Sequence, residues 1–539
     1  MNILKGLCGA ALAIIATAPL AAQDIPIVEK TLSNGMKLLL VERHDDPTFA
    51  AGWMARVGSA NERPGITGLA HLFEHMMFKG SKTIGTRDAK RDAELNALQD
   101  SIQVEVRKEY AILREQQRRG TISNMMDPKA RTPRLQQLLE RFEAAVKEQR
   151  ALIVKDEIWK IYQEAGATGL NASTSQDRTF YIVSLPSNKV ELWLWMESDR
   201  LANPVFREFY SERDVIQEER RQTLESRPDG LVGEAFQAMT WMASSYHWQV
   251  IGWPSDIATV TREAANDFFA TFYAPNNLTA ILVGDFDATK VAALAEQYFG
   301  RIPMNPKGVP ELTTLEPPQP AEQRMVAELE SSPSLQVEFK AVPGVHKDAP
   351  ALQVLAGVLS GAGGSMGGRG GGGGGMRATG RLNKALVLDR KAATSASASS
   401  RGQKYGGLFT LRATPAPGRQ PADLEPLLYA ELDKIVKEGI TEEELARFKN
   451  AQQVAQYNRL ESNTGIREAL AQAVSSGDWK DFLEQPKRIQ AVTREDVQRV
   501  AKQYLIKESR NVLITTRKGA APEGGPRRRP TPQPPTEVK

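Results

Sequence analysis

Two stretches of the 539-residue chain decide its fold: IATVTREAANDFFATFYAPNNLTAILVG, residues 257–284, and IQAVTREDVQRVAKQYLIKESRNVLITT, residues 489–516. Each begins Ile-x-x-Val-Thr-Arg-Glu, continues with apolar residues at helical spacing, and ends in a polar break and an apolar run. This pattern predicts a helix with Thr261 or Thr493 as its N-cap and an acidic first turn, followed by a strand. The chain therefore repeats itself at an offset of 232 residues, from 257 to 489.

The repeat predicts an α+β fold made of two homologous α/β units, each with a mixed, mainly antiparallel sheet and helices. The first unit spans residues 24–300 and the second spans residues 324–517. Between them, residues 301–323 contain six prolines, which indicates an interdomain linker. Strands are expected at Lys37–Glu42, Thr48–Val57, Arg178–Leu185, Leu335–Ala341 and Gly407–Ala413.

Two segments lie outside the repeat. Residues from 89 to about 162 are rich in charge, carry apolar residues at helical spacing and are broken near their middle, which predicts an inserted antiparallel helical hairpin. Residues 361–375 hold 11 glycines in 15 positions. No Gly-Lys-Ser/Thr follows this glycine run, so we interpret it as a flexible surface loop and not as a phosphate-binding loop.

The two ends of the chain indicate export and a solvated tail. Residues 1–22 contain one lysine, an apolar run and then small residues, the pattern of a secretory signal peptide that is too short to span a membrane. Cys8, inside that peptide, is the only cysteine, so we expect no disulfide and no thiolate ligand in the mature chain. We also expect no transmembrane span in the mature chain. Residues 518–539 predict a disordered Pro/Arg-rich tail. The net charge of +4, without interleaved aromatic and basic residues, gives no reason to expect nucleic-acid binding.

The stretch HLFEH, residues 71–75, carries the candidate chemistry. On a helix His71 and His75 share a face and Glu74 lies beside them, so two imidazoles can hold one cation with a carboxylate at its edge. The spacing suits zinc, and only five histidines occur in the chain, which makes a chance pairing around a glutamate a poor explanation. A buried helix with hydrogen-bonded histidines is the alternative. The order His-x-x-Glu-His is that of the inverzincins.

The segment GSANERPGITGLAHLFEHMMFKGS, residues 58–81, resembles the pitrilysin family of zinc metallopeptidases. That family includes insulin-degrading enzyme and the β subunit of the mitochondrial processing peptidase. The similarity covers nearly all of the mature chain and is clear in LNASTSQDRTFYIVSL (170–185), SERDVIQEERRQ (211–222) and FYAPNNLTAILVGDFD (272–287). A tandem α/β repeat is also what the family shows.

The resemblance implies the rest of a zinc site. The histidine count leaves a carboxylate as the third protein ligand, and the family takes it from the last position of Glu-Arg-Asp-Val-Ile-x-x-Glu. This implies Glu219 as the ligand and Glu212 as a supporting carboxylate. Glu218 is the alternative, but it projects about 100° away on a helix, so Glu219 is favoured. The gap of 143 residues between His75 and Glu219 exceeds the family's usual gap by close to the length of the inserted hairpin.

The implied activity is zinc-dependent hydrolysis of peptide bonds in a clamshell chamber, with one zinc ion per chain and Glu74 as the general base. In the family an extended peptide or unfolded segment lies against an edge strand, so Asn171 and Ala172 are candidates for backbone contacts with substrate. A turn that caps a strand is the alternative for these two residues. Some relatives are non-catalytic core or scaffold subunits of membrane-associated complexes, and this is the alternative function.

The family's chamber contains four such units and this chain supplies two, so the resemblance implies a dimer. An Arg/Tyr pair that helps to hold substrate in active relatives falls here on Val387 and Thr394. Its loss favours a heterodimer with a related zinc-less subunit over a homodimer. The glycine run falls where the α subunit of the processing peptidase has a substrate-handling loop, which is a second interpretation of it. Export without an anchor indicates the bacterial periplasm.

Overall fold

The computed structural model describes residues 25–361 and 380–519. The predicted signal peptide at residues 1–22 lies outside the described residues. So do all but the first residue of the glycine run at 361–375 and all but the first two residues of the predicted tail at 518–539.

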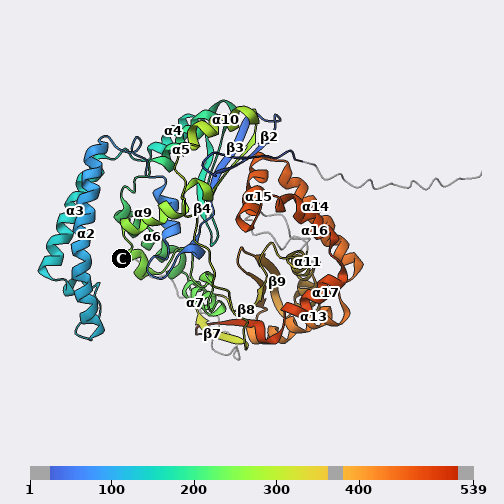
Figure 1. Cartoon of the computed structure of the whole chain (residues 1–539). Helices are drawn as coiled ribbons and strands as arrows, with labels where there is room; N and C mark the ends of the chain where they lie inside the picture. Colours follow the sequence, from blue (N-terminus) through green and yellow to red (C-terminus); the bar gives the residue numbers. More distant parts are fainter. Residues whose placement is uncertain (1–24, 362–379, 520–539) are drawn as a thin grey trace, which may run out of the picture.

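Each half of the chain is built on one mixed sheet (Figure 1). The first sheet has the strand order β1-β2-β6-β3-β5-β4, and the second has the order β7-β11-β8-β10-β9. The β2–β6 and β7–β11 pairs are parallel and the other pairs are antiparallel. Five strands of the first sheet, in the order β2-β6-β3-β5-β4, therefore have the same arrangement as the second sheet, in the order β7-β11-β8-β10-β9. The predicted fold class is confirmed.

The strands expected from the sequence are present, with ends that differ by one or two residues. The first sheet consists of β1 (Val28–Thr31), β2 (Lys37–Glu42), β3 (Thr48–Ala55), β4 (Thr168–Thr174), β5 (Thr179–Pro186) and β6 (Leu278–Gly284). The second sheet consists of β7 (Gln323–Leu329), β8 (Ser334–Ala341), β9 (Ala393–Gly402), β10 (Gly407–Pro415) and β11 (Arg510–Arg517). Residues 303–322, inside the Pro-rich segment, form neither helix nor strand.

Helices cover both sheets. In the first half they are α1 (Leu69–Met76), α2 (Ala89–Arg118), α3 (Pro133–Leu152), α4 (Glu157–Glu164), α5 (Val190–Ala202), α6 (Phe209–Arg220), α7 (Gly230–Thr240), α8 (Pro254–Thr259), α9 (Arg262–Phe272) and α10 (Ala288–Phe299). In the second half they are α11 (Ala349–Ser360), α13 (Glu425–Glu438), α14 (Glu442–Leu460), α15 (Asn463–Ser476), α16 (Asp481–Ala491) and α17 (Arg494–Tyr504). Across the described ranges, none of the helices is long and apolar enough to cross a membrane.

The repeated stretches form the same structure in both halves. Helices α9 and α17 begin after Thr261 and Thr493, whose hydroxyl groups accept hydrogen bonds from the backbone N–H groups of Ala264 and Asp496. These N-caps confirm the predicted starts of both helices. Each helix is followed by a short turn and then by an interior strand of its sheet, β6 or β11.

The first sheet is covered on both faces. Leu38 and Leu40 of β2 point into the main core, which α1, α5, α6, α9 and α10 close. Leu39 and Val41 point to the opposite face, as the alternation of side chains along a strand requires. The central strands therefore bury apolar side chains on both faces.

Each half of the chain contributes one helix that covers the sheet of the other half. The second face of the first sheet is covered by α15, whose Ile466, Leu470 and Val474 pack in one cluster with Met54 and Phe180 (Figure 1). Burying each of these aliphatic side chains contributes about 1.5–3 kcal/mol. Helix α7, which occupies the equivalent place in the first half, lies against β7 and β11 of the second sheet. Neither sheet is covered by its own half alone.

The inserted hairpin consists of α2 and α3, which run along one side of the first half (Figure 1). Its base is fixed by a buried ion pair, in which Arg207 Nε lies 2.8 Å from Asp92 Oδ2. Gln149 of α3 donates to Asp92 and accepts from Gln99, at 2.8 and 2.9 Å. The hairpin ends at Leu152, ten residues before the expected limit, because the following helix α4 packs into the main core.

Candidate metal centre

Helix α1 carries His71, Glu74 and His75. It begins after Gly68, which has a φ of +86°, and a Cβ at this position would lie 2.5 Å from the carbonyl oxygen of Ile251. Only glycine fits there without strain. The carboxylate of Glu62 accepts hydrogen bonds from the N–H groups of Gly68 and Ala70, at 2.9 and 2.7 Å. Glu62 thereby satisfies free N–H groups at the start of the helix and fixes it in place.

Helix α6 packs against α1 and carries Glu212 and Glu219 two turns apart. Glu219 Oε1 lies 3.7 Å from His71 Nε2, and Glu219 Oε2 lies 3.5 Å from His75 Nε2. In the described ranges these three residues are the only group of three or more possible ligands, all within 4.8 Å of one another. Glu218 lies apart from them, in contact with Arg221 and hydrogen-bonded to Gln222.

The distances between these ligand atoms suit a small cation. Zinc bonds of about 2.0–2.2 Å in a tetrahedron place neighbouring ligand atoms about 3.3–3.6 Å apart. The observed 3.5 and 3.7 Å are close to that range and longer than ordinary hydrogen bonds. His71 Nδ1 is buried and has no hydrogen-bond partner among the described residues. The alternative interpretation of HLFEH, histidines held by hydrogen bonds, therefore has no protein partner for this atom among the described residues.

The surroundings of the two histidines shift their pKa values in opposite directions. Burial, and then the neighbouring His75, lowers the pKa of His71 to about 4, so its imidazole is neutral at pH 7. Burial acts to lower the pKa of His75 as well, but Glu212, Glu219 and Glu74 together raise it. These carboxylates attract positive charge to this point, and a cation bound by His75 would have to displace a proton from it.

Glu212 contacts His75 on the side away from Glu219. Glu212 Oε1 lies 2.9 Å from His75 Nδ1, and Glu212 Oε2 lies 2.6 Å from Lys79 Nζ. Burial acts to raise the pKa of Glu212, but the hydrogen bonds from His75 and Lys79 hold it below its ordinary value. A His75 that donates Nδ1–H to this carboxylate presents Nε2 as the free ligand atom. The sequence interpretation missed Lys79, although it follows His75 by four residues.

Glu74 is half-buried beside the histidines, and its Oε2 accepts a 2.6 Å hydrogen bond from the hydroxyl group of Thr174. Burial raises the pKa of Glu74, and the Thr174 hydrogen bond lowers it by less. A carboxylate whose pKa is raised toward neutrality is a better proton acceptor than an exposed one. The sequence interpretation also missed Thr174, although this residue ends the LNAST segment from which two other candidates were taken.

Strand β4 carries Asn171 and Ala172 and is the last strand of its sheet. It pairs with β5 on one side, where Asn171 lies opposite Ile182 and Ala172 lies opposite Tyr181. Among the described residues no strand pairs with its other side. Both residues therefore belong to an edge strand and not to a capping turn, and β4 also contacts α1.

The chain after Glu219 continues in a π-helical turn, Arg221–Glu225. The preceding residue, Arg220, is buried and makes two parallel contacts with Glu234, from Nη1 to Oε1 at 2.8 Å and from Nη2 to Oε2 at 2.7 Å. Its Nη1 also donates to the carbonyl oxygen of Gly252 at 2.8 Å. Because Arg220 is fixed in this way, the backbone that presents Glu219 is fixed as well.

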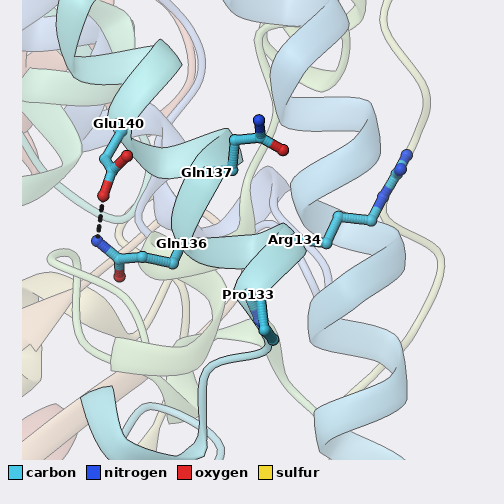
Figure 2. Close-up of a pocket in the computed structure, with 5 residues that line it drawn as sticks. All are labelled: Pro133, Arg134, Gln136, Gln137 and Glu140. Atoms are coloured by element: carbon cyan, nitrogen blue, oxygen red, sulfur yellow. Dashed lines mark hydrogen bonds between the residues drawn. The ribbon is translucent and has the colours of Figure 1, made fainter.

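Two surface depressions lie along the hairpin side of the molecule. One is lined by α3 residues alone, and Figure 2 shows Gln136 hydrogen-bonded there to Glu140; its residues are Pro133, Arg134, Gln136, Gln137 and Glu140. The other lies between the end of α3 and α6 and is lined by Arg150, Ser211, Asp214, Val215, Glu218, Glu219 and Gln222. Only the second depression includes a residue of the candidate metal centre.

One family model matches the first half of the chain, and a second family model matches much of the second half. The model described as Insulinase (Peptidase family M16) matches residues 37–165 and 154–252, and the model described as Peptidase M16 inactive domain matches residues 259–452. The zinc protease PqqE of Helicobacter pylori is 24% identical over 511 residues, which are 93% of this chain and 95% of PqqE.

Solved structures have the same fold. A protease from Helicobacter pylori superimposes with a TM-score of 0.71 at 22% identity, over 91% of this chain and 99% of that protein. The periplasmic protease PqqL from Escherichia coli superimposes with a TM-score of 0.64 at 17% identity, over 92% of this chain but 48% of PqqL. Both family models and the shared two-sheet fold lead to one conclusion, that the protein belongs to peptidase family M16.

Proposed function

We propose that the protein is a zinc-dependent metalloendopeptidase that hydrolyses extended peptides or unfolded segments. The observation that carries this proposal is the placement of His71 Nε2 and His75 Nε2 within 3.7 Å of the Glu219 carboxylate. Two imidazoles and one carboxylate form a ligand set used by catalytic zinc, with a further position left for water or substrate. The name of PqqE as a zinc protease is consistent with this assignment.

In the proposed reaction His71, His75 and Glu219 would hold a zinc ion, and Glu212 would orient His75. Zinc held there would supply a lowered pKa of water and polarisation of the carbonyl group of the peptide bond. Glu74 accepts the proton of the attacking water and then donates it to the leaving amine. Thr174 holds the carboxylate of Glu74 in position while this proton is transferred.

Strand β4 supplies a place for substrate beside Glu74. Its backbone N–H and C=O groups on the side away from β5 can pair with an extended peptide, which adds a strand to the sheet. Asn171 and Ala172 lie in this strand, and Thr174, which ends it, contacts Glu74. A peptide paired with β4 would therefore pass close to the proposed general base.

A second chain is proposed to complete the chamber. The chain superimposes on 48% of PqqL and on 92% of a structure that contains only the first half of PqqL. Val387 lies in the π-helical segment Asn383–Asp389 and Thr394 in β9, and neither can replace an arginine or a tyrosine in contact with substrate. We therefore propose a heterodimer with a related zinc-less subunit. Full activity from a purified homodimer, measured together with its mass, would contradict this assembly.

We also propose that the protein is exported to the bacterial periplasm. The composition of residues 1–22 supports export, and the structural relative PqqL is described as a periplasmic protease. Determining the N-terminal residue of the protein isolated from its source tests this proposal. A start near residue 23 is expected, and an intact Met1 in the cytoplasmic fraction would contradict it.

The proposed activity is tested with the purified protein and an unstructured peptide. We expect one zinc ion per chain by elemental analysis, loss of cleavage when a chelator removes the metal, and recovery when zinc is added back. A protein that carries no zinc and does not cleave the peptide, alone or with its partner, would contradict this proposal. That result would favour the alternative function, a non-catalytic scaffold subunit.

A further inference from the structure

Lys79 is the group that neutralises the buried carboxylate behind His75. Glu212 is 5% exposed, and among the described residues its ion pairs are with His75 and Lys79. A carboxylate that is removed from water is costly unless it has an opposing charge and hydrogen-bond donors. Its two oxygens divide these partners, because Oε1 faces His75 Nδ1 at 2.9 Å and Oε2 faces Lys79 Nζ at 2.6 Å.

The two partners of Glu212 contribute differently. An imidazole that would coordinate a cation through Nε2 keeps its proton on Nδ1 and can donate it in a hydrogen bond to Glu212. The ammonium group of Lys79 supplies an opposing charge in contact with the other oxygen of this carboxylate.

The backbone of Lys79 is itself held in place. Its carbonyl oxygen accepts a 2.8 Å hydrogen bond from Nη1 of the buried Arg207, and its N–H donates to the carbonyl oxygen of Met76. Its ammonium group also lies 3.7 Å from Glu208 Oε2, one helical turn before Glu212. Lys79 therefore connects the end of α1 to the first turn of α6 from a fixed position.

We propose that Lys79 is a positioning residue for zinc, which acts by holding Glu212 in the orientation that presents His75 Nε2 to the metal. The proposal depends on the proposed function, because it requires that His75 is a ligand. Partners of a metal-binding histidine are typically worth 10–100-fold in metal affinity. We expect Lys79→Met to weaken zinc binding by about 10–100-fold.

The direction of this effect separates two explanations. Lys79 is a cation near a cation site, so through-space electrostatics alone predicts that its removal makes zinc bind more tightly. Positioning through Glu212 predicts the opposite. Lys82→Met is a matched control, because Lys82 is exposed in the same segment and the substitution removes the same charge without a contact to Glu212.

The test is a zinc titration of the metal-free full-length protein against a competing chelator. We expect Lys79→Met to lose about 10–100-fold in affinity, Lys79→Arg to recover much of that loss, and Lys82→Met to match wild type. The melting temperatures of the metal-free variants show whether Lys79→Met simply disrupts the fold. If Lys79→Met disrupts the fold, Lys79→Arg and Lys79→Gln are compared with each other, and Lys79→Arg should bind zinc more tightly than Lys79→Gln.

Two results would overturn the inference, and they can be told apart. If wild type binds zinc and cleaves peptide while Lys79→Met binds zinc equally well or more tightly, this inference is wrong and the proposed function stands. If wild type itself binds no zinc, both are wrong. A changed visible spectrum of the Co²⁺-loaded Lys79→Met protein, with an unchanged spectrum for Lys82→Met, would give independent support for a change at the metal ligands.

Discussion

The hydroxyl group of Thr174 donates a 2.6 Å hydrogen bond to Oε2 of Glu74 and so connects the end of the edge strand β4 to the proposed general base. Thr174→Val keeps the shape of the side chain and removes this donor. A hydrogen bond to a charged group contributes about 1.5–3 kcal/mol, so kcat should fall by about tenfold or more. Thr174→Ser keeps the hydroxyl group and should stay close to wild type.

The same substitution should change the dependence of activity on pH. The Thr174 hydrogen bond lowers the pKa of Glu74 against the larger effect of burial, so its loss should raise this pKa further. Glu74 acts as a base only when it is ionised, and the acid limb of kcat/KM should therefore move to higher pH in Thr174→Val. A limb that stays in place or moves to lower pH would show that this bond does not control the ionisation of Glu74.

The buried pair Arg220–Glu234 should hold the end of α6. Glu234→Gln removes the buried counter-charge of Arg220 and leaves, among the described residues, only the exposed Glu225, whose Oε1 lies 3.0 Å from Arg220 Nε. Removing one partner of a buried ion pair costs about 3–5 kcal/mol in the free energy of unfolding, which urea denaturation of the metal-free protein measures. Arg221→Gln is the control, because it removes an exposed pair with Glu218 and should cost less than about 1 kcal/mol. Equal effects of the two substitutions would contradict this account of Arg220.

The exchange of helices predicts that a substitution in the second half weakens the first. Leu470 of α15 is fully buried against the first sheet, and Leu470→Ala should cost about 2–5 kcal/mol. Val454→Ala on the neighbouring α14 removes a side chain that is 61% exposed and should change stability by less than about 0.5 kcal/mol. Hydrogen exchange should show lower protection in β3 and β6 for Leu470→Ala. Loss of protection confined to the second half would contradict the exchange.

Much of the fold could be predicted from the sequence, because local signals define its elements. Thr261 and Thr493 are N-caps followed by acidic first turns, and each opens a helix that leads into a strand. The exchange of α7 and α15 could not be predicted in this way. Both helices carry an apolar face, and an apolar face does not specify which of two similar sheets it will cover.

The site could be predicted in part for a similar reason. His71, Glu74 and His75 lie within one helix, so their spacing alone brings them together. Glu219 required a resemblance, because no local rule brings α6 to α1 across the intervening hairpin. Lys79 and Thr174 were missed because a lysine and a threonine are ordinary surface residues in sequence, and only tertiary structure places them against Glu212 and Glu74.

The most direct test of the central claim is the Glu74→Gln variant, measured for zinc content and for peptide hydrolysis in the same preparation. Glu74 is not one of the three grouped ligands, so the variant should retain one zinc ion per chain. Loss of the general base should lower kcat by about 10²–10⁴-fold, while the control Glu218→Gln should remain close to wild type. Zinc-loaded Glu74→Gln protein that hydrolyses peptide at the wild-type rate would contradict the proposed mechanism.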